Sequence, residues 1–142
     1  MPARQPASRW YNPREDGGQA KKRRFTGLDS QALARKIVDV ASDKQAVDIV
    51  LLDLRDVSLI ADYFVICNGT SDRQIKAIVD DIRETLHREE KLKPLQMEGT
   101  PDSGWVLLDY GSVVVHVFSP ELREYYRLEK IWSQAIPVLR IA

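Results

Sequence analysis

The sequence predicts an α/β fold: a single domain with a mixed β-sheet and helices mainly on one face. Three observations lead to this prediction. Short apolar runs rich in β-branched residues alternate with amphipathic segments, which is typical of sheets packed against helices. Two of these runs, 49–54 and 113–118, lack polar alternation, which indicates strands buried on both faces. A length of 142 residues fits one domain with a tail.

Residues 1–28 are expected to form a disordered basic tail, and residues 29–142 the domain. The tail holds scattered proline and glycine without periodicity. Residues 1–30 carry seven basic and three acidic side chains, a net charge of +4, and the remaining residues carry fourteen and eighteen, a net charge of −4. The run Lys21 to Arg24 offers cations for contact with rRNA phosphates, although a solubilising role is the favoured interpretation. An acidic domain argues against an all-round nucleic-acid binder.

The first half of the domain is expected to contain two helices and two strands. Asp29 or Ser30 caps a helix that ends near 42–44, because apolar residues follow at helical spacing. Strands are expected over 48–54 and 61–68. Ser71 or Asp72 caps a second helix, whose apolar stripe runs through Ile75, Ile78, Val79, Ile82 and Leu86. That helix ends within 91–94.

The second half is expected to contain a short edge strand, a hairpin and a last helix. A short strand is expected over 95–97, and an edge position would tolerate the nearby Pro94. The hairpin spans Trp105–Phe118, with Tyr110-Gly111 as a two-residue turn. Ser119 caps the last helix, with Pro120 in its first turn, and Pro137 ends it.

The two faces of the hairpin differ in composition. One face is wholly aliphatic and is expected to lie in the core. The other face mixes large apolar and ionisable side chains, and with only three helices it is expected to remain partly open to a partner. Its residues are Trp105, Leu107, Asp109, Val114, His116 and Phe118. The alternative is that Trp105 and Phe118 pack under the last helix.

The sequence offers little support for catalysis or metal binding. Cys67 lies inside an apolar strand, where an inert thiol is the usual outcome, so a nucleophile–base pair with His116 or His87 is disfavoured. Two histidines and one cysteine, widely spaced, form no ligand cluster, and no cofactor is expected. The single cysteine and the absence of a long apolar run favour the cytoplasm and no membrane association.

The stretch Asn68-Gly69-Thr70-Ser71 resembles the strand-to-helix entry of the nucleotidyltransferase superfamily. A small-residue turn at a helix N-terminus can bind phosphate. In that superfamily an Asp-x-Asp pair on a following strand holds magnesium ions, and here Glu98 and Asp109 stand apart. The fold is therefore expected to be nucleotidyltransferase-like without the catalytic carboxylates, and Gly69 to Ser71 to serve as a structural cap.

A more specific resemblance covers residues 30–134. The stretches DYFVICNGTS (62–71), EG (98–99), WVLLDYG (105–111), VVHVF (114–118) and REYYRLEKIW (123–132) resemble the ribosomal silencing factor family, also called RsfS or Iojap-like. The resemblance implies a non-enzymatic translational repressor that binds the large ribosomal subunit through large-subunit ribosomal protein fourteen. Binding there sterically blocks association with the small subunit and lowers translation under nutrient limitation, and organellar relatives act in large-subunit assembly.

The partner-binding residues expected at this stage lie on the hairpin and the last helix. Arg123 and Tyr126 join the mixed face of the hairpin, and a homodimer is left open. Ser112 stands at a turn position where relatives often carry an acidic residue, which puts a contact through that charge in doubt. The alternatives are a nucleotidyltransferase-like enzyme and an RNA-binding ribosome assembly factor.

The tail supplies the first testable prediction. Deletion of residues 1–28 should leave the melting temperature of the domain nearly unchanged, because the segment lacks any core-forming pattern. A thermal melt followed by circular dichroism on the full and truncated chains tests this. A fall of many degrees in the truncated chain would place the domain boundary elsewhere.

Overall fold

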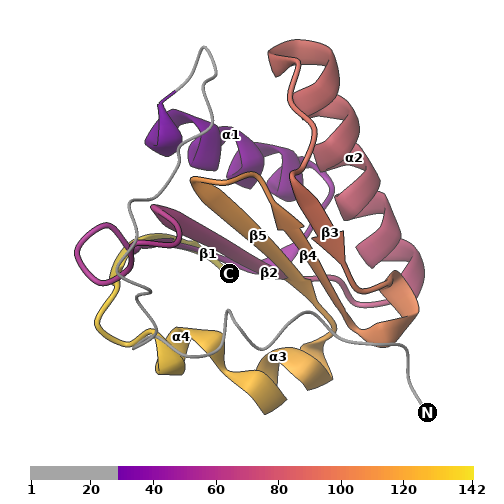
Figure 1. Ribbon diagram of the computed structural model, residues 1–142. Coiled ribbons are helices and arrows are strands. Elements are labelled where there is room, and N and C mark those ends of the chain that lie inside the picture. Colours follow the sequence, from indigo (N-terminus) through magenta and orange to yellow (C-terminus); the bar gives the residue numbers. More distant parts are fainter. Residues whose placement is uncertain (1–28) are drawn as a thin grey trace.

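A six-stranded sheet runs through the domain, with helices against both of its faces (Figure 1). The computed structural model describes residues 29–142, so the basic tail lies outside the described residues. The helices are α1 (Ser30–Asp43), α2 (Asp72–Glu90), α3 (Pro120–Tyr126) and α4 (Leu128–Ile131), with one 3-10 turn, η2 (Pro101–Ser103). The strands are β1 (Val47–Asp53), β2 (Tyr63–Asn68), β3 (Gln96–Glu98), β4 (Trp105–Asp109), β5 (Val113–Phe118) and β6 (Ile136–Ile141).

The order of strands across the sheet is β3-β4-β5-β2-β1-β6. The central pair, β2 and β5, is parallel, and the other pairings are antiparallel, so the predicted mixed sheet is confirmed. Parallel neighbours cannot be joined by a tight turn. The chain therefore leaves β2 through α2, crosses to β3 and β4, and returns along β5.

The two long helices form one layer on the sheet. Asp29 caps α1 by accepting a hydrogen bond from the Ala32 N–H at 2.7 Å, and Ser71 caps α2 through the Gln74 N–H at 3.1 Å. Both caps agree with the sequence prediction. Lys36 on α1 pairs with Glu89 and Glu90 on α2 at 2.6 and 2.8 Å, which fixes the two helices side by side.

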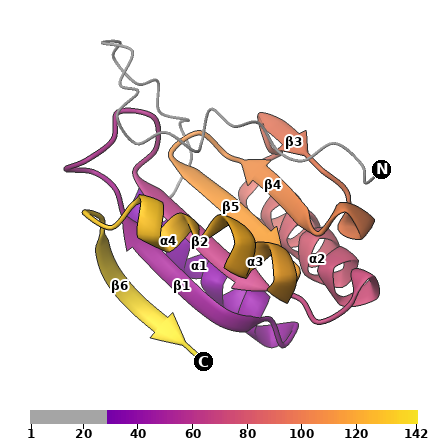
Figure 2. The same ribbon diagram turned by 90° about the horizontal axis from the view of Figure 1, so that it is seen from below.

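The second layer, α3 and α4, lies on the opposite face of the sheet, as Figure 2 shows from below. The sequence predicts one continuous helix here, and that prediction is wrong. Arg127 adopts a left-handed conformation, with φ of 50°, and separates the two short helices. The long helices thus sit on one face as expected, but the other face is covered as well.

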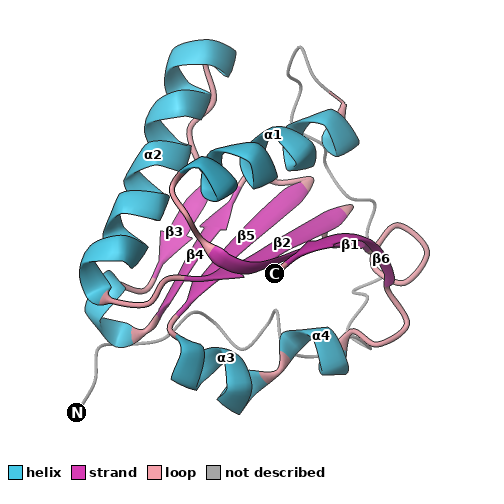
Figure 3. Cartoon of the chain, turned by 180° about the vertical axis from the view of Figure 1, so that it is seen from behind, coloured by secondary structure: helices cyan, strands magenta, loops and turns pink. Residues whose placement is uncertain are grey.

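The C-terminal strand is a second difference from the sequence prediction. The sequence predicts that Pro137 only ends the last helix, whereas it lies within β6, which pairs with β1 at the edge of the sheet (Figure 3). An edge position tolerates proline because one side of the strand needs no N–H donors. The β-branched residues of IPVLRI are the signal that could have identified this strand.

The hairpin of β4 and β5 forms with a different turn from the one predicted. The loop is Gly111-Ser112, and the Tyr110 N–H donates to the Val113 carbonyl at 2.9 Å. Gly111 takes a φ of 90°, which favours glycine at the first loop position of such a turn. Trp105 therefore lies opposite Phe118 instead of His116. The register shift is two residues, so every side chain keeps its predicted face.

Candidate partner-binding site

The mixed face of the hairpin forms a buried cluster beneath α3 and α4. Trp105 is 2% exposed, and Leu107, Val114, His116 and Phe118 are 0% exposed. Side chains from the second layer cover this face: Leu122, Tyr126, Leu128, Ile131 and Trp132. The expectation that this face stays partly open to a partner is wrong for this structure. Arg127 separates α3 from α4, and side chains of both helices cover this face.

Aromatic rings fill the space between the sheet and the second layer. Trp105 packs against Phe118 and Tyr126, with ring centroids 4.7 Å apart in both pairs. Phe64 on β2 contacts Trp132 edge to face at 5.5 Å. Such pairs stabilise a core beyond the area they bury. Trp105 thus packs beneath α3 within the chain. This is the alternative named in the sequence analysis, in which Trp105 and Phe118 lie under the last helix.

His116 lies in the middle of this cluster. Its Nδ1 accepts a hydrogen bond from the Trp105 indole N–H at 3.2 Å, and its ring contacts Phe64 edge to face at 4.5 Å. Since Nδ1 accepts, Nε2 carries the proton of the neutral ring, and this buried group has no hydrogen-bond partner. Burial lowers the pKa of His116 to about 3. The imidazole is therefore neutral and cannot act as a charged contact.

The side chains of Asp109 and Arg123 also form hydrogen bonds within the chain. The Asp109 carboxylate accepts a hydrogen bond from the Gly111 N–H at 2.8 Å, which stabilises the hairpin turn, and the side chain is 8% exposed. Arg123 is 7% exposed and donates to Glu129 at 2.7 Å. It also donates to the Asp48 carbonyl at 2.7 Å.

Arg123 therefore joins the second layer to the sheet. A further hydrogen bond from its guanidinium reaches the Asn68 side-chain oxygen at 2.8 Å. Asp48 in turn binds Arg140 on β6 at 2.8 Å, so one network links α3, α4, β1, β2 and β6. Buried charges of this kind need several partners to offset the loss of hydration. We infer a positioning role for Arg123 within the fold.

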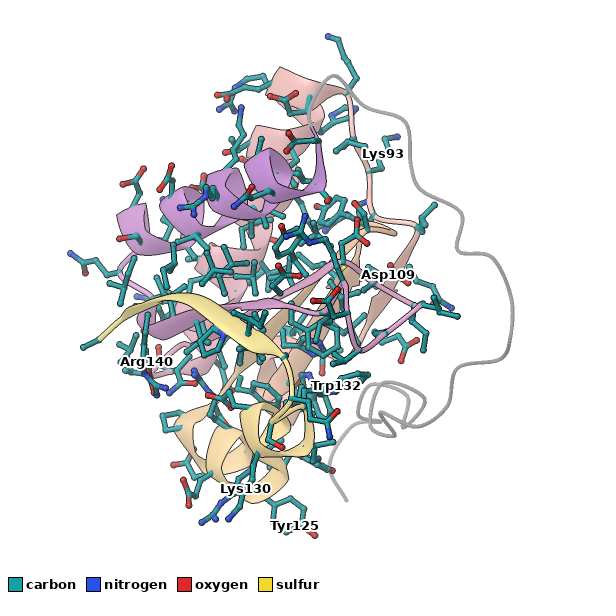
Figure 4. All side chains as sticks on the ribbon, turned by 90° about the vertical axis from the view of Figure 1, so that its left-hand side faces the viewer. Lys93, Asp109, Tyr125, Lys130, Trp132 and Arg140 are labelled. Carbon is teal, nitrogen blue, oxygen red and sulfur yellow. The ribbon has the colours of Figure 1, made fainter. Side chains whose placement is uncertain are left out.

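The outer side of α3 and α4 remains accessible. Tyr125 is 74% exposed, while its neighbour Tyr126 is half-buried and packs edge to face against it, with ring centroids 4.9 Å apart. Figure 4 shows Tyr125 and Lys130 directed away from the sheet, whereas Trp132 lies close to it. Of the eight residues expected to bind a partner, Tyr126 alone is not buried. Sequence spacing did not single out Tyr125 as the exposed member of the tyrosine pair.

The α2 N-terminus is occupied by side chains of the chain itself. The Gln74 side-chain oxygen accepts hydrogen bonds from the Thr70 N–H at 2.7 Å and the Thr70 hydroxyl at 2.8 Å, while Ser71 caps the Gln74 N–H. A Cβ on Gly69 would lie 2.6 Å from the Ile75 side chain and 2.9 Å from its nitrogen. Strand and helix thus pack closely at Gly69, and the polar groups of this turn bond to one another, which supports the structural-cap interpretation of Gly69 to Ser71.

Cys67 and His116 do not form a catalytic pair. They lie on the neighbouring strands β2 and β5 but face opposite sides of the sheet, in separate clusters. Burial raises the pKa of the Cys67 thiol to about 12, so the thiol stays protonated. Within residues 29–142, no group of three or more metal-ligating side chains gathers, and no helix is long and apolar enough to cross a membrane.

The burial of Trp105 gives a stability prediction. Trp105→Ala should lower the free energy of unfolding by about 3–5 kcal/mol, because it leaves a cavity beneath α3. Tyr125→Ala is the control and should lower it by about 1 kcal/mol or less, since that side chain is exposed and loses only its ring contact with Tyr126. Urea titrations followed by circular dichroism measure both. A Trp105→Ala protein as stable as the wild type would show that this face is open in solution.

The neutral, buried His116 gives a prediction for acid stability. An unfolded histidine has a pKa near 6.5, and the folded value is lower, so the unfolded state binds more protons between these limits. The free energy of unfolding is unaffected by this group above pH 6.5 and falls as the pH drops toward 3, by about 1.4 kcal/mol per pH unit. His116→Gln should remove this slope, whereas His87→Gln, on the exposed surface of α2, should keep it. Chemical denaturation at several pH values measures the difference, and equal slopes in both variants would contradict a buried neutral imidazole.

Comparison with known proteins places the chain in a family. Residues 28–141 match the family described as "Ribosomal silencing factor during starvation". The ribosomal silencing factor RsfS of Bacillus subtilis is 42% identical over 108 residues, which cover 76% of this chain and 91% of that protein. The mouse protein named "Mitochondrial assembly of ribosomal large subunit protein 1" is 34% identical over 99 residues, covering 68% of this chain and 43% of that protein.

A solved structure agrees with the fold. A crystal structure of a Chromobacterium violaceum protein superimposes with a TM-score of 0.71 at 29% identity, and the match covers 75% of this chain and 88% of that one. The family match spans the sheet and both helical layers, from α1 through β6. The resemblance seen in the hairpin and in the residues that follow it is thereby confirmed, and the chain belongs to the ribosomal silencing factor family.

Proposed function

We propose that this protein is a translational repressor that binds the large ribosomal subunit through large-subunit ribosomal protein fourteen. Bound there, it sterically blocks association with the small subunit and lowers translation under nutrient limitation. Membership of the ribosomal silencing factor family is the observation that carries the proposal. The name of the mouse relative, which refers to assembly of the ribosomal large subunit, supports the choice of subunit.

The described surface is consistent with action by binding rather than by catalysis. The buried histidine is neutral and the thiol protonated, and the helix N-terminus that resembles a phosphate site is filled by Gln74. We therefore propose a non-enzymatic protein, and its likeness to a bacterial ribosomal silencing factor supports the further proposal that it acts in the cytoplasm. Magnesium-dependent nucleotide transfer by the purified chain would favour the nucleotidyltransferase-like alternative instead.

The residues expected to bind the partner divide into two groups. The proposal assigns an indirect role to the seven buried residues, which hold α3, α4 and the hairpin in place. It assigns a direct contact to Tyr126, together with the exposed Tyr125 beside it. Contact between the basic tail and rRNA stays a prediction, as does a homodimer.

Subunit joining provides the test. Purified large and small subunits are mixed with increasing amounts of the protein and separated on a sucrose gradient. The joined particle should decrease as the protein co-migrates with the large subunit, because a bound protein excludes the small subunit. Co-migration without any loss of joined particles would contradict the blocking mechanism and favour an assembly role. Equal binding to naked rRNA would favour the RNA-binding alternative.

A further inference from the structure

A groove runs between the C-terminal half of α2 and the edge strand β3. Its volume is about 570 Å³. Asp80, Arg83, Glu84 and His87 line one side, at positions that share one face of the helix. The segment from Leu92 to Met97 lines the other side. Neither the buried aromatic cluster nor the exposed surface of α3 and α4 contributes to this groove.

Two large apolar side chains are exposed on the β3 side of the groove. Leu95 is 56% exposed and Met97 is 42% exposed, although β3 is the edge of the sheet. Exposed apolar side chains on an edge strand favour unwanted association, and natural proteins usually place charges or proline there unless a partner covers them. Leu95 and Met97 are two residues apart in the chain, and both line the groove, so each offers apolar surface to a molecule bound there.

The charges around this apolar surface indicate what kind of partner fits. Arg83 and Lys93 form no ion pair within residues 29–142, and Figure 4 shows Lys93 on the segment between α2 and β3. Asp80 is already paired with Lys76 at 2.6 Å, which leaves Glu84 as the unpaired carboxylate of the lining. The lining therefore has two unpaired cations, Arg83 on the helix side and Lys93 on the strand side, and one unpaired carboxylate, so a partner with acidic side chains gains favourable contacts on both sides of the groove.

We propose that this groove is a docking site for a protein segment of the large ribosomal subunit, one that places an apolar side chain on Leu95 and Met97 and carboxylates beside Arg83 and Lys93. This inference rests on the proposed function, since it names a second surface, separate from Tyr125 and Tyr126, by which the chain contacts the subunit. A protein segment fits better than RNA because an exposed leucine and methionine offer nothing to a phosphate backbone. An apolar centre surrounded by polar groups is also the usual anatomy of a protein interface.

The experiment measures binding of the full chain to purified large subunits by co-sedimentation. The double variant Leu95→Ser/Met97→Ser should bind at least about tenfold more weakly, because it removes the apolar centre without adding charge. Leu59→Ser is the matched control: that leucine is 47% exposed on the loop after β1 and should leave binding unchanged. Arg83→Gln/Lys93→Gln should weaken binding by a smaller factor of about two to five.

The outcomes separate the groove from the proposed function. If the wild-type chain does not sediment with large subunits, both the proposed function and the groove assignment fail. If the wild type binds and Leu95→Ser/Met97→Ser binds equally well, the groove assignment alone is wrong. If only the Arg83→Gln/Lys93→Gln variant loses binding, with a steep salt dependence, the occupant is RNA and the proposal is overturned.

Two control measurements accompany the binding assay. Thermal melts of both double variants should match the wild type, since the serine replacements lie at exposed positions; Met97→Ser alone is the second variant if the double variant unfolds. Analytical ultracentrifugation of the wild type and Leu95→Ser/Met97→Ser should give the same molecular mass. A dimer that becomes a monomer in the variant would make the groove an interface between two copies of this chain, and would overturn the proposal.

Discussion

The parallel pairing of β2 with β5 is the constraint on which the rest of the structure depends. Both strands are buried on both faces, so each face must be covered by another layer. The crossover that parallel pairing requires places α2 on one face and returns the chain through β3 and β4. Within residues 29–142, the segment that covers the second face follows β5. The short helices α3 and α4 therefore cover the second face of the central strands and complete the core on that side.

This constraint explains why the aromatic face of the hairpin serves the fold. A face with tryptophan, histidine and phenylalanine has the composition of an interface, and here the interface forms between parts of one chain. The hydrogen bond from Trp105 to His116 satisfies one of the two polar nitrogens of the imidazole. The other stays without a partner, a cost that the packing of Phe64, Phe118 and Trp132 around the cluster offsets. Surfaces available to a partner lie elsewhere, at the tyrosine pair of α3 and at the groove beside β3.

Local signals in the sequence were sufficient for most of the fold but not for the site. Asp29, Ser71 and Ser119 cap helices as predicted, because capping depends on a few neighbouring atoms. Alternation predicted correctly which side chains share a face of the hairpin, even though the turn was misplaced by one residue. The strand containing Pro137 depends on its pairing with β1, and the position of α3 depends on the hydrogen bond from Arg123 to Asn68, so both depend on residues distant in sequence. Exposure of a face likewise depends on what packs over it, so the partner-binding residues could not be chosen by composition alone.

The position of β6 has a consequence for how the domain is made. β6 pairs with β1, yet almost the whole domain separates the two strands in the chain. During synthesis, the outer edge of β1 stays unpaired until β6 has been made. Asp48 can pair with Arg123 before that point, but its ion pair with Arg140 forms only afterwards. Until then the nascent sheet presents an unpaired, strongly apolar strand, the kind of edge that recruits chaperones or other chains. A delay between exposure of β1 and release of residues 136–141 would therefore lengthen the time during which this edge is open to other chains.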